Sequence, residues 1–442
     1  MLATSHIALF LSAEYIASIV TTLSNGLTAG SSSLKIASMK TMTSLATMIP
    51  QQSHLEPFYV LIEKMIHALQ QLCMAYSTSD DEKELELATE FITCMIELGE
   101  ERGTLFVPQL EPCFNSIMDI VESNLKPNSS INHLLVEFLV TLCSSITKQC
   151  RKIKSPTTAA EKGHFGARLL PYCAKMMLNV EFDPEWATSE ELDDTLHEIN
   201  DFTTGDNAFS EISSALGLRS TFTLVFDILK NLLSSPEESK KYAGLHIIAN
   251  YVEVTCKIPD KNQLEQHRID ISTTLIGYTS DIHPRVRAAS FYGIFKFAST
   301  HGDSLTQSQT DDFLKVLLSA LSIATNPSPR VRQYALLGLI SILDITPEES
   351  LGRWAGIILG QIANTLTESP LIVQEQCVTV ISTLANSVDG EIMKNYYDSI
   401  MPILKHWFTR TDQKKVNDFI RIIYQYITSR TPLSGKFVIA KG

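Results

Sequence analysis

The chain has 442 residues, of which 44% are hydrophobic and 19% are charged. This composition predicts a folded chain, and the length predicts either two or three ordinary domains or one elongated repeat array. Lys and Arg number 36 against 49 Asp and Glu, so the formal net charge is −13. A net acidic chain lacks the basic face that binding to a nucleic-acid backbone needs, and it suits a partner with a basic surface.

The N-terminal segment is apolar from Ile7 to Leu11, but no Lys or Arg precedes it and it continues into Glu14 at helical spacing. This pattern favours a first helix over a cleaved signal peptide. The sequence contains no run of 18 apolar residues, so we expect no membrane span.

The cysteines are single residues in apolar surroundings, without a CxxC pair and without histidines at zinc-binding spacing. They predict buried free thiols in a reducing compartment, and no metal or other cofactor is expected. The eight cysteines are Cys73, Cys94, Cys113, Cys143, Cys150, Cys173, Cys256 and Cys377.

Apolar residues recur at steps of three and four along almost the whole chain, while the alternation typical of strands is nearly absent. This period predicts an all-α protein. The stretch that shows it most clearly carries Phe58, Ile62, Met65, Leu69 and Leu72 on one helical face.

A repeated motif divides the C-terminal half. Residues 281–287 read Asp-Ile-His-Pro-Arg-Val-Arg, residues 326–332 read Asn-Pro-Ser-Pro-Arg-Val-Arg, and Ser369-Pro370 begins another copy. Two helices in 40 to 50 residues are the period of HEAT repeats, which must stack because one pair cannot bury its own apolar face. The sequence therefore predicts an α-solenoid of about eight or nine repeats. Predicted core positions of successive repeats are Ala37, Ala88, Leu135, Ala243, Ala289, Ala335 and Cys377.

The turn motif also predicts local contacts. Asp281 and Asn326 are placed to cap the following helix, and the proline suits its first turn. Arg287 and Arg332 are predicted to reach carbonyl or acidic groups of a neighbouring repeat, with ligand contact as the alternative.

An acidic insertion interrupts the series. We predict N-terminal repeats over residues 1–180, an insertion over 181–206 and C-terminal repeats over 207–442. The insertion has ten carboxylates and no Lys or Arg, so its charge of −10 leaves only −3 for the rest of the chain. Such a run is either a solvated loop or a docked one, and Trp186 and Leu192 would anchor it on the scaffold or on a partner.

Several segments, in order, resemble the importin-beta-3 type of the karyopherin-beta (importin-beta) family. They are residues 169–177, 183–186, 190–194, 206–208, 281–289, 375–379 and 396–406. The resemblance covers roughly residues 165 to 410, and the chain looks like part of such a receptor. It implies a HEAT superhelix that shuttles between cytoplasm and nucleus, imports cargo with basic signals, contacts Phe-Gly nucleoporins and releases cargo to Ran-GTP.

The resemblance also implies site residues. The acidic loop would contact partners or Ran through Glu181, Asp183, Glu185, Trp186, Glu190, Glu191, Asp193 and Asp194. Cargo would bind to inner helices, for which the candidates are Glu90, Glu97, Glu137, Asn250, Glu253, Glu375 and Asn386. Each of these is also explicable as part of an ordinary solvated face.

Two alternatives remain. The chain is a HEAT scaffold of the phosphatase regulatory or chromosome-organising type, or it is a truncated receptor fragment with exposed end faces. The sequence has no Walker A, HExxH or GxSxG motif, so we do not expect an enzyme.

Overall fold

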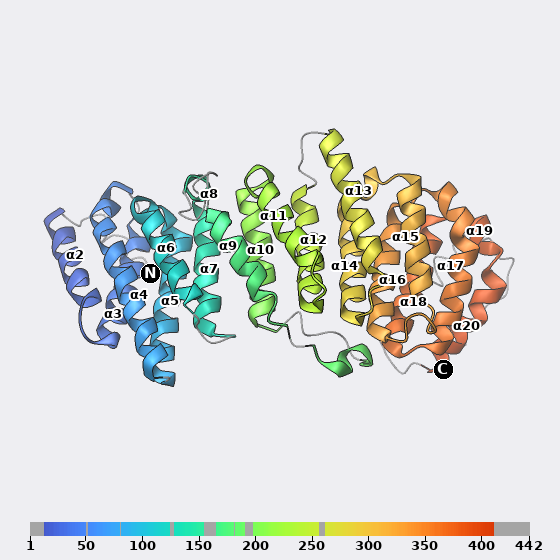
Figure 1. Ribbon diagram of the computed structural model, residues 1–442, viewed down its shortest axis with the longest axis horizontal. Helices are drawn as coiled ribbons and strands as arrows, with labels where there is room; N and C mark the ends of the chain where they lie inside the picture. Colours follow the sequence, from blue (N-terminus) through green and yellow to red (C-terminus); the bar gives the residue numbers. More distant parts are fainter. Residues whose placement is uncertain are drawn as a thin grey trace, which may run out of the picture. The chain divides into compact units, whose positions relative to one another are not determined.

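A computed structural model describes residues 13–49, 52–79, 81–123, 128–153, 165–180, 182–190, 198–255 and 261–410 (Figure 1). Within these ranges every regular element is a helix, and no strand occurs. The prediction of an all-α HEAT solenoid is therefore confirmed for the part of the chain that is described. None of its helices is long and apolar enough to cross a membrane.

The chain folds into two compact units. Unit 1 consists of residues 1–180 and 196–234, and unit 2 consists of residues 181–195 and 235–442. Residues 181–195, which are part of the predicted acidic insertion, therefore belong to unit 2. The residues directly before and directly after them in the sequence belong to unit 1.

Unit 1 has two layers of helices. The first layer holds α2 (Ala13–Leu27), α4 (Tyr59–Ser79), α6 (Leu110–Glu122), α9 (Phe165–Met176) and α11 (Leu218–Leu233). The second layer holds α3 (Ser32–Met48), α5 (Glu82–Arg102), α7 (Ser130–Ser145) and α10 (Asp201–Leu216), each packed against the next. Short helices connect them: η2 (Gln52–Phe58), η3 (Gly103–Gln109) and α8 (Thr147–Cys150).

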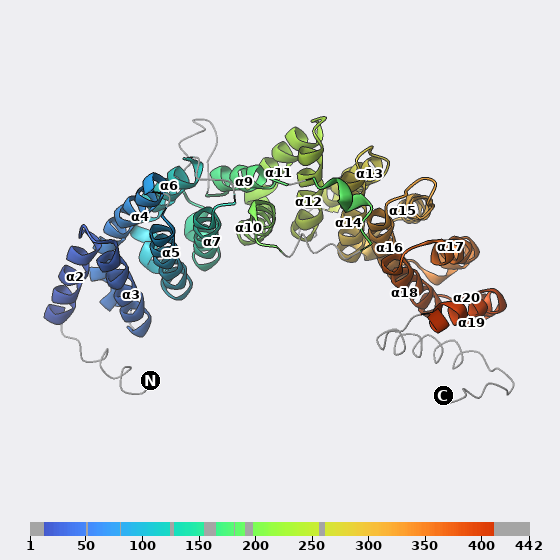
Figure 2. The ribbon, with the colours of Figure 1, turned by 90° about the horizontal axis from the view of Figure 1, so that it is seen from below.

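Unit 2 repeats this arrangement, and Figure 2 shows the paired layers within it. Its second layer holds α12 (Glu238–Thr255), α14 (Pro284–His301), α16 (Pro329–Ile345) and α18 (Leu371–Ser387). Its first layer holds α13 (Lys261–Tyr278), α15 (Gln307–Ala320) and α17 (Glu348–Glu368), and the chain continues into α19 (Gly390–Lys394) and α20 (Tyr397–Arg410). The short helices are η4 (Pro184–Ala187) and η6 (Gly302–Ser304).

Apolar faces between the two layers form the core of each unit. The five residues that showed the helical period between 58 and 72 are all at most 1% exposed. Six of the seven predicted core positions are buried as well, from Ala88 to Cys377. The prediction for Ala37 was wrong, because α3 turns its neighbours Ile36 and Ser38 inward and leaves Ala37 exposed.

The turn residues of unit 2 make different bonds from those predicted. The N-cap of α16 is Ser328, whose side chain accepts from the amide of Val331, and Asn326 does not cap the helix. The Asn326 side-chain oxygen instead accepts from Arg287 Nε at 2.7 Å. Asp281 accepts from the amide of His283, the N-cap residue of α14, and pairs with Lys241 at 2.8 Å.

These bonds form a ladder along the second layer. Lys241 of α12 reaches Asp281 in the next turn, and Arg287 of α14 reaches Asn326 in the turn after that. Arg332 of α16 is the next member, and it is only 2% exposed. Among the described residues its Nε and Nη1 have no hydrogen-bond partner, and neither does the hydroxyl of Ser369 in the following turn. Within this part of the chain, Nε and Nη1 of Arg332 therefore have no acceptor in the following turn.

The cysteines within the described ranges are free and buried, in agreement with the prediction, whereas Cys256 lies outside these ranges. Burial raises the pKa of Cys73, Cys113, Cys173 and Cys377 to about 12. These thiols stay protonated at neutral pH and behave as small apolar side chains.

The acidic insertion ends earlier than predicted, because α10 begins at Asp201. Asn200 is its N-cap, and the side chains of Asn200 and Thr203 each accept from the other's backbone amide in a capping box. This exchange satisfies two amides that the first turn of a helix leaves free. Residues 201–206 are therefore helical, and Asp201 and Asp206 do not belong to the loop.

Candidate partner-binding groove

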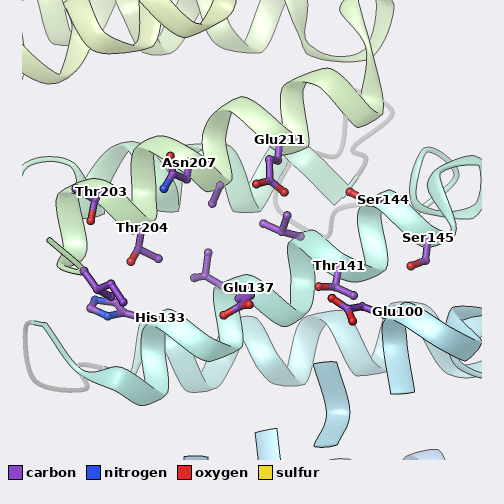
Figure 3. Close-up of a pocket in the computed structure, with 14 residues that line it drawn as sticks. Glu100, His133, Glu137, Thr141, Ser144, Ser145, Thr203, Thr204, Asn207 and Glu211 are labelled. Carbon is purple, nitrogen blue, oxygen red and sulfur yellow. The ribbon is translucent and has the colours of Figure 1, made fainter. Parts of the chain in front are cut away.

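A groove of about 750 Å³ opens on the second layer of unit 1, between α5, α7 and α10 (Figure 3). Three carboxylates from three different helices line it: Glu100 of α5, Glu137 of α7 and Glu211 of α10. All three residues are exposed, and no Lys or Arg is among the lining residues. The groove is therefore a concentration of negative charge built from consecutive repeats.

The remaining lining residues offer hydroxyls and apolar surface. The hydroxyls belong to Thr141, Ser144, Ser145, Thr203 and Thr204, and the apolar contacts come from Val136, Val140, Ile199 and Ala208. Ile199 is 86% exposed, although it is a large aliphatic residue. His133 and Asn207 complete the lining. A groove with apolar walls and a few polar groups is the usual form of a binding site.

The three carboxylates repel one another. Burial raises the pKa of Glu137, and the charges of Glu100 and Glu211 raise it further. Placing a cation in the groove would relieve this repulsion, because opposite charges favour the ionised carboxylates. The arrangement can therefore hold a lysine or arginine side chain.

One end of the groove is fixed by a buried polar cluster. His133 Nε2 lies 2.7 Å from Asp201 Oδ1, and the other carboxylate oxygen accepts from the Asn128 amide and from Asn179 Nδ2. Burial raises the pKa of Asp201, but these hydrogen bonds outweigh it and lower the net pKa. The cluster joins α7 to the first residue of α10, so it positions the groove residues that α10 supplies.

All seven predicted cargo residues lie on second-layer helices, three of them in unit 1 and four in unit 2. Glu137 lines the groove, while Glu90 of α5 is paired with Lys40 at 2.5 Å and is committed to that contact. The remaining residue of unit 1 is Glu97, and the four in unit 2 are Asn250, Glu253, Glu375 and Asn386. Glu253 lies 3.6 Å from Lys296.

Sequence reasoning missed Glu100 and Glu211, which the structure places beside Glu137. Glu100 follows Glu97 by three residues, so it lies on nearly the same face of α5. No such spacing pointed to Glu211. The insertion before α10 interrupts the repeat spacing, so the sequence did not indicate which residues of α10 face the groove.

The acidic loop is only partly available to a partner. Asp183, Glu185 and Glu190 are exposed, as expected of a solvated acidic segment. Trp186 is 3% exposed, because its indole packs against Arg285 and Arg330 of unit 2, in line with the alternative in which the loop docks on its own scaffold. Four predicted loop residues, Glu181, Glu191, Asp193 and Asp194, lie outside the described ranges, as does the second predicted anchor, Leu192.

Trp186 is held by two arginines. The guanidinium carbons of Arg285 and Arg330 lie 5.1 Å and 5.4 Å from the centre of its indole ring. Arg330 also donates to the Ser189 hydroxyl at 3.1 Å. Cation–π contacts of this kind stabilise a desolvated aromatic ring.

Metal binding has little support in the described ranges, where no three His, Cys, Asp or Glu side chains gather closely enough to hold an ion. The groove carboxylates therefore act as separate charges that face a shared space.

Comparison of this chain with known proteins finds similarity to importins, which are helical solenoids. A family model described as an importin repeat matches residues 124–222, which include α7, α10 and their side of the groove. Importin subunit beta-3 of Saccharomyces cerevisiae (strain ATCC 204508 / S288c) is 22% identical over 392 residues. The match covers 88% of this chain and 33% of that protein, so the chain spans about a third of the relative's length.

Solved structures agree on the fold. Kap121p bound to the extreme C-terminus of the protein phosphatase Cdc14p aligns with a TM-score of 0.76 at 19% identity, over 96% of this chain and 39% of that one. Kap121p bound to Nup53p aligns with a TM-score of 0.77 at 18% identity, over 96% and 38% of the two chains. The chain is therefore similar to karyopherin-beta proteins of the importin type over this part of their length, and the solved neighbours share its fold.

Proposed function

We propose that the chain is the cargo-binding part of a nuclear import receptor, and that the groove of unit 1 holds a basic segment of the cargo. The observation that carries this proposal is the convergence of Glu100, Glu137 and Glu211, which no basic side chain in the lining offsets. A Lys-rich segment would neutralise them, and the neighbouring hydroxyls would accept its remaining hydrogen bonds.

The partners of the solved relatives support this proposal. Kap121p has been solved with a terminal segment of one protein and with Nup53p. A groove that crosses three helices suits an extended segment of this kind. We extend the proposal to nucleoporin contact, to shuttling between cytoplasm and nucleus, and to cargo release by Ran-GTP. Release is compatible with a solenoid, because small rotations between repeats let two partners favour different curvatures.

The test is binding of a fluorescent Lys-rich import-signal peptide to the full chain, with and without Ran-GTP. The variant Glu100→Gln/Glu137→Gln/Glu211→Gln should bind about 30-fold more weakly, which corresponds to about 2 kcal/mol. The matched control is Glu56→Gln/Glu63→Gln/Glu111→Gln, which removes the same charge from η2, α4 and α6, outside the groove.

The control should retain the affinity of the unmodified chain. If both variants lose the same affinity for the peptide, the effect comes from net charge alone, and the proposal that the groove binds the peptide is contradicted. Binding that ignores Ran-GTP would leave peptide recognition intact and remove the proposed release step. No peptide binding at any salt concentration would favour the scaffold alternative.

A further inference from the structure

Residues 182–189, which we name the strap, cross the N-terminal ends of three successive helices of unit 2. The turn η4 within the strap lies beside α16 in Figures 1 and 2. Phe182 stacks edge-on against Tyr242 of α12 and against His283, the N-cap of α14. Trp186 contacts Arg285 of α14 and Arg330 of α16.

The surface beneath the strap consists of Tyr242, His283, Arg285 and Arg330, and we name it the cradle. Arg285 is 5% exposed and Arg330 is 8% exposed, so both guanidinium groups are shielded by their neighbours. Both arginines lie in the first turn of a helix, where the helix dipole also favours negative charge. The cradle therefore combines aromatic contacts with two shielded guanidinium groups.

The strap has the complementary chemistry. Its two aromatic rings, Phe182 and Trp186, contact the cradle, while Asp183 and Glu185, which lie between them in the sequence, stay exposed. Asp183 also organises the strap itself, because its side chain accepts from the Glu185 amide at 2.8 Å and so caps η4. The rings are thereby held at a fixed spacing, as in a short peptide ligand.

We propose that the cradle is a binding site for short segments that carry aromatic residues beside carboxylates, and that the strap is its resident ligand. A partner segment of the same chemistry binds by displacing the strap. A tethered ligand acts at an effective concentration in the millimolar range. The strap therefore excludes segments that bind the cradle weakly, and a segment with a higher affinity displaces it. This site lies in unit 2 and binds acidic segments, so it is independent of the basic-segment groove of unit 1.

The test replaces residues 182–189 by Gly and Ser at the same length and adds a fluorescent peptide with the sequence of the strap. The strap-replaced chain should bind this peptide at least tenfold more tightly than the unmodified chain, in which the strap competes. Adding Arg285→Ala and Arg330→Ala to the strap-replaced chain should abolish binding. The control substitution Arg353→Ala, at an exposed arginine on α17, should leave binding unchanged. A peptide with Ala at the tryptophan position should not bind.

Trp186→Ala provides a second test that does not depend on the replacement folding correctly. It should admit the peptide in trans and increase amide hydrogen exchange over residues 182–190 and over the first turns of α14 and α16. The proposal is overturned if either variant keeps its native circular dichroism spectrum and binds no peptide, or if binding does not depend on the two arginines.

Discussion

At the scale of single residues, the raised pKa of Glu137 sets the stability of the chain against the binding role that we propose for this residue. Its pKa is raised in the folded protein, so the folded state holds the proton more tightly than the unfolded chain does. Stability from this group is therefore largest below its unfolded pKa and falls as the pH rises through the folded pKa. A cost of this kind is expected where a site needs several like charges close together.

Glu137→Gln should accordingly stabilise the chain at neutral pH, by about 0.3 kcal/mol for relief of surface repulsion. The same variant should weaken binding of a Lys-rich peptide about tenfold. In the unmodified chain, affinity should decrease as the pH falls through the raised pKa of Glu137, which lies above its ordinary value of 4.5. Denaturation curves and peptide titrations at several pH values measure both effects. A variant that is less stable and binds normally would contradict this assignment.

Arg332 gives a second prediction for a single residue. Within the described part of the chain its two unpartnered nitrogens are buried, and an unsatisfied buried donor costs about 1 to 3 kcal/mol. In the preceding repeat, the side-chain oxygen of Asn326 accepts a hydrogen bond from Arg287. Ser369 occupies the corresponding position, in the turn before Pro370, in the repeat that contains Arg332. Ser369→Asn should therefore supply the longer acceptor and raise the free energy of unfolding by about 1 kcal/mol. The gain should disappear in an Arg332→Met background, which a double-mutant cycle measures.

At the scale of helices, the sequence predicted the elements better than it predicted their contacts. The helical period and the repeat motif depend on local spacing, so they predicted the helices and most of the residues that each helix turns inward, with Ala37 as the exception. The convergence of Glu100, Glu137 and Glu211 depends on how three helices stack, and the spacing within one helix does not contain that information. The same limit applies to Asn326, which pairs with an arginine of the previous repeat although its turn position suggested a cap.

Asp201 of α10 bonds to three residues outside its own helix and allows a direct test. Asp201→Asn keeps the side-chain size but removes the charge that accepts from His133, Asn128 and Asn179. At pH 7 the variant should lose about 2 kcal/mol of stability. Because the folded pKa of Asp201 is lowered, its contribution is present above the unfolded pKa and disappears as the pH falls through the folded value, below 3.8.

The difference between Asp201→Asn and the unmodified chain should therefore shrink under strongly acidic conditions. Chemical denaturation at pH 7 and near pH 3 measures it, and Asp227→Asn on α11 is the matched control. A constant difference at both pH values would mean that shape, and not charge, holds the cluster together.

At the scale of the whole molecule, the net charge of −13 is unevenly distributed along the sequence. Most of it lies between residues 181 and 206, and the described carboxylates at 183, 185 and 190 are exposed. Deleting this whole segment would be a poor test of its charge, because the deletion would also remove Trp186 from the cradle and Asp201 from the polar cluster.

The sharper variant is Asp183→Asn/Glu185→Gln/Glu190→Gln, which removes three negative charges and leaves Trp186 in place. If the loop steers basic partners, this variant should lower the association rate of a Lys-rich peptide several-fold at low salt, with little change in the dissociation rate. The difference should disappear as the Debye length falls from about 10 Å at 0.1 M salt to about 3 Å at 1 M. Stopped-flow measurements give both rates, and the variant that removes three charges from η2, α4 and α6 controls for net charge. Equal association rates for all three proteins at low salt would show that the loop carboxylates do not steer partners, and would restrict the loop's role to its contacts with unit 2.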